Sequence, residues 1–451
     1  MRILSILCGL VLLAAFSFAW GAATTRFKVF PYSIIQPVAQ ELYAFWVSDP
    51  NEPVISSAQK LESDNGGIPY RFLQRQALPF DAPPNRPTFE IDTGGVFIKG
   101  HHDPDIFPGY FLISGAFNFD QDKNVGTILI STDGRFIGGW PHQQYNDVNP
   151  TVDVARNKIL VSGEYTVDWD CDISDLGRDL SLHNFGDGHH GATLAPDGTY
   201  WTLFENGLRQ YDPDATGEDG KFAILRSIGL GPDLLAHNPL ISPTSARFSI
   251  AWDAEQDPLK IAPKVGYERD PFHNNDVEPF VSSRFPTAAG YALLVSVREQ
   301  NLIMVIDPDT KEILWFRQGL TERQHDPDFA DDGIYVYNNR TFAGTSRIDY
   351  IPFQSDGGPA FGMRTVIDGA DYGWFDPSRG QHSVFYRDGL RHHLVINDRN
   401  GRLLVVTEEG NTAFELVNIL SGQNDERTRL QLRTALYLDE ATFTDLTANC
   451  Q

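Results

Sequence analysis

Cysteines and basic residues are scarce in this chain. Three cysteines occur among 451 residues, and neither of the two beyond the N-terminal segment has a second cysteine nearby at zinc-ligand spacing. Lys and Arg together number 36 against 60 Asp and Glu, so the formal net charge is -24. A surface of that sign repels nucleic acids and anionic membranes, and neither is expected as a partner.

Long hydrophobic runs are also missing, except at the N-terminus. A Met-Arg start precedes an apolar run at 3–18, and small residues stand at 21–23. This pattern is typical of a secretory signal peptide, and the run is short for a membrane span. We therefore predict a signal peptide over 1–22 and a periplasmic or secreted protein with no membrane contact after cleavage. A single N-terminal membrane anchor is the alternative.

The predicted signal peptide contains Cys8, which leaves Cys171 and Cys450 in the mature chain. In an oxidising compartment two such thiols can pair. Their wide spacing in the sequence does not decide whether they form a disulfide.

Motifs for nucleotides and for several hydrolases are absent. There is no Gly-x-x-x-x-Gly-Lys-Ser/Thr loop, so the sequence does not support nucleotide binding by that route. Cys/Ser-x-Pro-x-Arg and His-Glu-x-x-His are missing as well. We predict no cofactor and no metal, although acidic residues near predicted strand openings leave calcium binding open. These residues are Asp103, Asp105, Asp276, Asp326 and Asp328.

A degenerate repeat is the dominant feature that the chain does have. Segments that open with a histidine and run into a predicted strand begin at His190, His273, His325 and His382, with a weaker copy at His102. With a further opening near 147, most spacings are about 45 to 55 residues, the length of one β-propeller blade. The longer gap after His190 contains a predicted loop insertion over 212–270.

Short β-rich runs separated by Asp-Gly, Asn-Gly and Asp-Pro turns fill the blades, and helical periodicity is scarce. The segments 126–140, 302–315 and 402–416 each predict a strand, a tight turn and a second strand. We predict an all-β protein with a six-bladed β-propeller, because radial repetition leaves only short, protected sheet edges. A pair of β-sandwiches is the alternative, but it does not explain the recurring histidine.

The predicted propeller spans 96–420. The segment 23–95 does not fit the repeat and is predicted to be an N-terminal extension or small cap, or else to supply a strand that closes the last blade. The segment 421–451 is predicted to be a C-terminal tail, with a short helix over 423–440 packed on the outside.

The stretch 273–339 carries several motifs in a fixed order. They are a His-x-Asn opening at His273, a Ser-x-Arg strand end at Arg298, an Ile-Asp-Pro-x-Thr hairpin at 306–315, a Gln-His-Asp opening at His325 and an Asn-Asn strand end at 338–339. In this order the motifs resemble the bacterial arylsulfate sulfotransferase family. Weaker matches extend the resemblance over 100–420. An apparent insertion at 282–290 and a shorter N-terminus depart from the family pattern.

The resemblance implies an active site in the central channel of the propeller. It implies that a sulfuryl group moves from a phenolic sulfate to another phenol through a sulfohistidine, without a nucleotide sulfate donor. Carried over residue by residue, the nucleophile is His325, and the resemblance makes His273, Arg298 and His190 catalytic. Asn275 and His189 become substrate-binding residues, and His189 and His190 compete for one role. The partners implied are small aryl sulfates and phenols, and a homodimer stays open.

Elementary chemistry agrees with these roles. A neutral imidazole is a competent nucleophile near neutral pH and can hold a transferred group covalently. A guanidinium such as Arg298 offers fixed donors to the oxygens of a sulfuryl group. His190 and His273 are suited to donate a proton or hydrogen bond to a departing phenolate. A non-enzymatic ligand- or protein-binding propeller and a quinoprotein-like oxidoreductase are the alternatives, and His382 is predicted to be structural.

Overall fold

The computed structural model describes the residues that form the sheets and most of the turns between them. They are 73–74, 80, 82–120, 123–141, 151–162, 165–168, 182–184, 188–204, 206–217, 220–235, 238, 241, 272–330, 332–340, 345–353, 363–376, 379–420 and 429–448. All lie within the unit Gly67–Gln451, one of two compact units of the chain. The predicted signal peptide, Cys171 and Cys450 lie outside the described residues. None of the described helices is long and apolar enough to cross a membrane.

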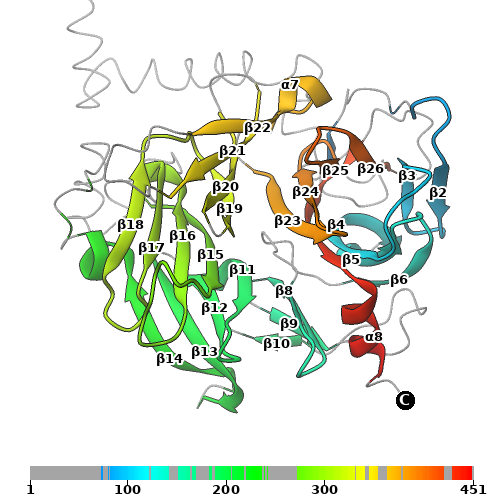
Figure 1. Cartoon of the computed structure of the whole chain (residues 1–451). Coiled ribbons are helices and arrows are strands. Elements are labelled where there is room, and N and C mark those ends of the chain that lie inside the picture. Colours follow the sequence, from blue (N-terminus) through cyan, green and yellow to red (C-terminus); the bar gives the residue numbers. More distant parts are fainter. Residues whose placement is uncertain are drawn as a thin grey trace, which may run out of the picture. The chain divides into compact units, whose positions relative to one another are not determined.

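Antiparallel sheets formed by strands that follow one another in the sequence make up this unit (Figure 1). The first complete sheet in chain order contains β7 (Thr151–Asp153), β8 (Lys158–Ser162), β9 (Tyr165–Asp168) and β10 (Leu182–Asn184). The next contains β11 (Gly188–Leu194), β12 (Tyr200–Phe204), β13 (Gly207–Thr216) and β14 (Phe222–Gly229). It is followed by β15 (Asn274–Phe280), β16 (Ala292–Val297), β17 (Leu302–Ile306) and β18 (Ile313–Gln318). Another contains β19 (His325–Ala330), β20 (Gly333–Asn338), β21 (Arg347–Pro352) and β22 (Arg364–Asp368).

Two further sheets combine strands from both ends of the described chain. One contains β4 (Tyr110–Asp120), β5 (Lys123–Ser131), β6 (Phe136–Pro141) and β28 (Leu432–Leu438). The other contains β2 (Thr88–Asp92), β3 (Phe97–His102), β23 (Gln381–Arg387), β24 (Leu390–Asn397), β25 (Arg402–Thr407) and β26 (Thr412–Asn418). A small sheet pairs β1 (Leu73–Gln74) with β27 (Arg429–Leu430). The helical elements are a π-helix at Leu230–Leu234, a 3₁₀ turn at Arg298–Gln300, α7 (Gly369–Tyr372) and α8 (Glu440–Ala448).

The sheets are the blades of an all-β β-propeller, as predicted. Their first strands touch from blade to blade, since β11 contacts β15, β15 contacts β19 and β19 contacts β23. These strands therefore lie on the inner side of the blades. Apolar side chains fill the spaces between neighbouring sheets, as in the cluster of Leu129, Trp140 and Ile159 between β5–β6 and β8.

The prediction of a six-bladed propeller is wrong in the number of blades. Among the described strands, five sheets are regular four-stranded blades, whereas the remaining sheet has six strands and is not a regular blade. The difference arises because β3 pairs antiparallel with β26, and β2 then pairs with β3. His102 therefore ends an added outer strand instead of opening a blade, and its Nδ1 lies 2.7 Å from the carbonyl oxygen of Asp103.

The C-terminal segment completes a blade, whereas 421–451 was predicted to be a tail with a helix over 423–440. Strand β28 pairs with β4 and occupies the edge of that sheet. Its side chains alternate between two cores: Leu432 and Ala435 join one, and Leu436 and Leu438 join the other. Burial on both faces explains why an apolar run here forms a strand. The helix comes later, as α8, where Phe443 stacks on Tyr110.

The three predicted hairpins are confirmed as β5–β6, β17–β18 and β25–β26. In the second, the Asp307 carboxylate accepts the backbone N–H groups of Asp309 and Thr310, which closes the turn. The predicted insertion over 212–270 begins later than expected, because β13 and β14 continue the blade to Gly229.

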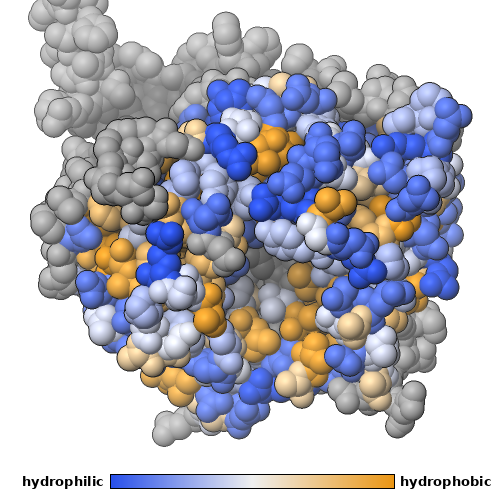
Figure 2. Space-filling model, viewed as in Figure 1, coloured by the Kyte–Doolittle hydropathy of each residue, from blue (hydrophilic) through white to orange (hydrophobic). Residues whose placement is uncertain are grey.

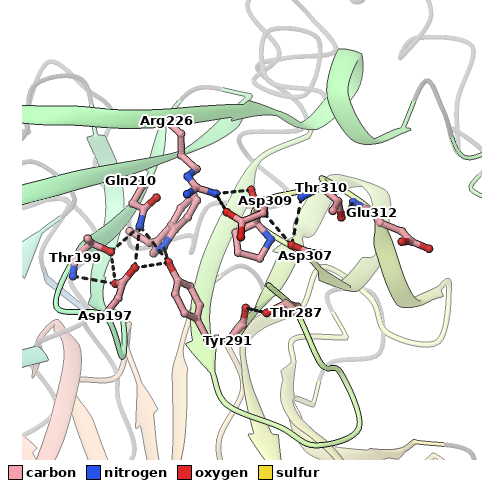
Figure 3. Close-up of polar contacts among 12 residues, drawn as sticks. Asp197, Thr199, Gln210, Arg226, Thr287, Tyr291, Asp307, Asp309, Thr310 and Glu312 are labelled. Atoms are coloured by element: carbon pink, nitrogen blue, oxygen red, sulfur yellow. Dashed lines mark hydrogen bonds and ion pairs between the residues drawn. The ribbon is translucent and has the colours of Figure 1, made fainter. Parts of the chain in front are cut away.

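A buried polar network joins the blade β11–β14 to the blade β15–β18 (Figure 3). The hydroxyl of Tyr291 accepts Trp201 Nε1–H and Gln210 Nε2–H, each at 3.1 Å. The same hydroxyl donates to Asp197 Oδ2, also at 3.1 Å. Tyr291 and Trp201 are fully buried, so water cannot take the place of these hydrogen bonds.

Replacing Tyr291 with Phe is expected to lower the free energy of unfolding by about 1–3 kcal/mol, because the buried Trp201 N–H loses its acceptor. Denaturant unfolding measures the change. The control is Tyr437→Phe, which removes an exposed hydroxyl bond to Pro108 and should cost about 0.5 kcal/mol or less. Equal stability of the two variants would contradict the role assigned to the network.

Candidate functional site

The inner strands of three successive blades carry a β-bulge near their first residues. The register shifts at His189/Ala192 in β11, at Asn274/Asp276 in β15 and at His325/Pro327 in β19. A bulge leaves a residue out of the ladder and re-aims its side chain, and bulges are frequent next to active sites. Here the residues left out include His190, Asn275 and Asp326. Figure 2 shows a hollow in the middle of the view, close to where β11, β19 and β23 lie in Figure 1.

His190 and His273 are brought together from different blades. Their ring centroids lie 5.2 Å apart, with an interplanar angle of 80°, an edge-to-face contact. Both residues have a positive φ, 58° for His190 and 43° for His273. Non-glycine residues seldom adopt this backbone conformation, and it clusters at functional sites. The backbone of His189 pairs with Leu203, and its side chain lies outside the described part of the chain.

Arg298 directly follows β16. Its backbone N–H donates to the backbone carbonyl of His273 at 3.1 Å, which links the two residues. Its guanidinium donates twice to Glu299 Oε1, at 3.0 and 2.8 Å. Arg323 donates to the same oxygen at 2.7 Å. Glu299 therefore ties Arg298 to the segment that leads into His325. The sequence interpretation missed Glu299 and Arg323, although each directly adjoins or closely precedes a predicted site residue.

His325 begins β19, and its side chain is nearly buried. Its Nδ1 lies 2.6 Å from Asn339 Oδ1 and 3.1 Å from the carbonyl oxygen of Arg323. Asn275 Nδ2 donates to the carbonyl of Gln324 at 2.7 Å, so the predicted site residues of β15 and β19 are joined directly. Asn275 Oδ1 is buried and has no hydrogen-bond partner among the described residues.

Gln324 explains the Gln-His-Asp motif. Its side chain is completely buried, and its Nε2 donates to Ser296 Oγ at 3.2 Å and to the Leu302 carbonyl at 3.1 Å. Its Oε1 accepts the Thr321 hydroxyl at 2.8 Å. Gln324 thus anchors the start of β19 to the neighbouring blade and holds the position of the following histidine.

Four carboxyl groups interact with one another at the start of these two blades: Asp276 and Glu278 from β15, and Asp326 and Asp328 from β19. Burial, followed by the charges of Asp326 and Glu278, raises the pKa of Asp276 well above its usual value, and the same causes act on Asp328. Burial raises the pKa of Glu278 to about 8, although Phe329 N–H donates to its Oε2 at 2.9 Å. Burial therefore favours the protonated form of each of these three groups.

His382 continues this buried chain into the next blade. Its ring Nδ1 is hydrogen-bonded to Asp328 Oδ2, and its ring Nε2 lies 3.0 Å from His393 Nδ1. Its backbone N–H donates to Asp326 Oδ2 at 2.9 Å. Burial, followed by His393, holds the pKa of His382 well below its usual value, and burial lowers the pKa of His393 to about 4. Burial therefore favours the uncharged forms of both Asp328 and His382, which share this hydrogen bond.

Among the residues that the structure describes, no three or more His, Cys, Asp or Glu side chains form a group that could hold a metal ion. Asp103, one of the acidic residues considered for calcium, instead forms an ion pair with Arg86 at 2.9 Å.

The fold and the site define a β-propeller protein with histidine and amide side chains at the bulged starts of inner strands and an arginine attached to one of them. Comparison with known protein families identifies the family of this chain. The arylsulfotransferase (ASST) family matches residues 165–419, more than half of the 451 residues, and the chain belongs to this family. The matched region includes His190, His273, Arg298 and His325.

Solved structures with similar folds are distant. A protein of unknown function from Bacteroides caccae is 13% identical with a TM-score of 0.43, covering 74% of this chain and 100% of that one. A protein of unknown function from Desulfotomaculum acetoxidans is 12% identical with a TM-score of 0.40, covering 78% and 98%. The Cps50 (Swd1) β-propeller domain from Myceliophthora thermophila is 11% identical with a TM-score of 0.38, covering 80% and 99%. No curated protein sequence matches this chain.

Proposed function

We propose that this protein transfers a sulfuryl group from an aryl sulfate ester to a phenolic acceptor, with His325 as the covalent carrier and without a nucleotide sulfate. One observation carries the proposal: His190, His273 and His325 stand at the bulged starts of inner strands from three consecutive blades in a chain of the ASST family. Such an arrangement supplies a nucleophile together with nearby proton donors.

The proposed reaction has two balanced halves. In the first, the lone pair of His325 attacks sulfur, an N–S bond forms, and the bond from sulfur to the aryl oxygen breaks. The departing phenolate takes a proton from His190 or His273, whose rings are in contact. In the second half, the histidine that gave up this proton, His190 or His273, removes the proton of the acceptor phenol. The phenol oxygen attacks sulfur, and the N–S bond breaks. One site used twice gives ping-pong kinetics.

Charge in the site favours an anionic donor. Arg298 and Arg323 both donate to one carboxylate, that of Glu299. Burial raises the pKa of Asp276, Glu278 and Asp328, which favours the uncharged form of each group. Guanidinium donors of this kind suit the oxygens of a sulfate ester. The unpaired Asn275 Oδ1 is suited to accept a hydrogen bond from an acceptor phenol.

The proposal includes export to the periplasm or the exterior, because the N-terminal sequence has the pattern of a signal peptide. Donor and acceptor would then be small aryl molecules outside the cytoplasm.

The test mixes the purified protein with 4-nitrophenyl sulfate and measures nitrophenolate release with and without a second phenol. We expect release that depends on the acceptor, and parallel lines in double-reciprocal plots. Release that is independent of any acceptor indicates a hydrolase. No release from a panel of aryl sulfates, combined with binding of those esters, would favour the non-enzymatic propeller.

A further inference from the structure

A single asparagine, Asn339, is the side-chain hydrogen-bond partner of His325 Nδ1. Asn339 directly follows β20 and is completely buried. Its Oδ1 lies 2.6 Å from His325 Nδ1. Its Nδ2 donates to the backbone carbonyls of Asp376, at 2.8 Å, and Arg379, at 2.5 Å.

These contacts determine which way the amide points. Both hydrogens of Asn339 Nδ2 are directed at carbonyl oxygens, which can only accept. A flipped amide would set its own oxygen against two carbonyl oxygens, so the orientation with Oδ1 toward the imidazole is the one that satisfies every group. Because an amide oxygen cannot donate, His325 Nδ1 must carry a hydrogen. The Arg323 carbonyl, 3.1 Å from the same nitrogen, is a second acceptor and leads to the same assignment.

The residues that present the two carbonyls, Asp376 and Arg379, are themselves hydrogen-bonded. Ser346 Oγ donates to the Asp376 carbonyl at 3.0 Å and accepts Asp376 N–H at 2.9 Å. The Asp376 carboxylate accepts the N–H groups of Arg379 at 3.2 Å and Arg399 at 3.1 Å. Ser346 and Asp376 are both fully buried. These hydrogen bonds hold the Asp376 backbone that accepts the Asn339 amide.

We propose that Asn339, oriented by the carbonyls of Asp376 and Arg379, is a positioning residue that fixes the neutral His325 ring as its Nδ1–H tautomer. The lone pair then lies on Nε2, and Nε2 is the atom that would carry the sulfuryl group. The tautomer assignment stands on geometry alone, and its consequence for catalysis rests on the proposed function.

The direct test measures the tautomer without any substrate. In protein labelled with ¹⁵N-histidine, long-range ¹H–¹⁵N spectra distinguish a protonated ring nitrogen from one with a lone pair, and His325→Gln assigns the signals. At a pH where His325 is neutral, we expect a hydrogen on Nδ1 and a lone pair on Nε2. The opposite pattern overturns the proposal, whether or not the protein transfers sulfuryl groups.

The second test asks whether the tautomer matters for the reaction. Asn339→Leu removes the acceptor and should lower kcat by about 10- to 100-fold, because the ring then populates the unreactive tautomer. KM for the donor should change by less than about two-fold, because ground-state binding is not altered. The ¹⁵N spectrum of this variant should show loss of the single Nδ1–H form.

Asn338→Ala is the matched control. Asn338 is the preceding residue, and its amide bonds Asp349 and the Glu322 N–H instead of His325. This variant loses a buried amide but should keep both the His325 tautomer and kcat within about three-fold. Equal losses of kcat in the two variants, or an unchanged tautomer in Asn339→Leu, would overturn the positioning role. Absence of transfer in the unmodified protein, with the expected tautomer, would instead reject only the proposed function.

Discussion

Substitution of His325 by Ala is expected to reduce sulfuryl transfer from 4-nitrophenyl sulfate to a phenol by at least about 10³-fold. The imidazole is the proposed covalent carrier, so its removal takes away both half-reactions and not only one contact. The protein should stay folded, because the side chain borders the inner face of the blades and the hydrogen bonds of Gln324, which anchor the strand, are unaffected.

The measurement is nitrophenolate release at saturating donor and acceptor, together with mass spectrometry of protein quenched with donor alone. The unsubstituted protein should gain one SO₃ group on the peptide that contains His325, and the variant should not. His102→Ala is the control, because this histidine lies on the added outer strand β3 and should leave the rate unchanged. Retention of more than about a tenth of the activity in His325→Ala would reject this residue as carrier.

A large dependence of stability on pH is expected from the buried carboxyl groups. Burial raises the pKa of Glu278 from 4.5 to about 8, so the folded state holds a proton that the unfolded chain releases above pH 4.5. Where the folded state binds more protons, stability falls as pH rises. The loss therefore develops between about pH 4.5 and pH 8 and is complete above pH 8. At about 1.4 kcal/mol per pH unit, Glu278 accounts for roughly 3–5 kcal/mol.

The variant Glu278→Gln is expected to remove most of that dependence. A glutamine oxygen can still accept the Phe329 N–H, but it has no proton to lose. Glu278 faces Asp276, Asp326 and Asp328, and His382 is bonded to the last of these, so their titrations leave a smaller residual slope. Denaturant unfolding at pH 5 and pH 9 should therefore show a smaller difference for the variant than for the unsubstituted protein.

Glu415→Gln is the control with the opposite sign. Burial tends to raise the pKa of Glu415, but hydrogen bonds from His101 and Arg402 outweigh it and hold that pKa below its usual value. Its ionised form is thus the stabilising one, and Glu415→Gln should destabilise the protein at neutral pH. Identical pH profiles for the unsubstituted protein and Glu278→Gln would show that Glu278 is not protonated in the folded state.

The blade pattern could be predicted from local sequence, and the ends of the propeller could not. Strands such as β17 and β18 are visible because their residues alternate or form apolar runs between turn residues. Strand β28 was predicted to be helical because its leucines give no sign of the partner strand, which lies more than three hundred residues earlier. The pairing of β3 with β26, which makes the six-stranded sheet, is equally remote in sequence.

The residues of the candidate site likewise differ in whether the sequence alone reveals them. His190, His273, Arg298 and His325 were found because they recur at strand starts and ends, where short motifs mark them. Glu299 and Arg323 were missed, and Asn339 was noted only as part of a strand-end motif without a role. A charged or amide side chain in a turn is common, and its neighbours in the sequence do not reveal its bonding partner.

By itself, the sequence determined the all-β architecture, the positions of the hairpins and the membership of the histidines in successive blades, because alternation and turn chemistry act over a few residues. Only the tertiary structure decided which groups meet: the His190–His273 contact, the Glu299 link between two arginines, and the Asn339 bond to His325. It also decided the raised pKa of Asp276, Glu278 and Asp328, since burial and neighbouring charge shift a pKa, and both come from residues distant in the chain.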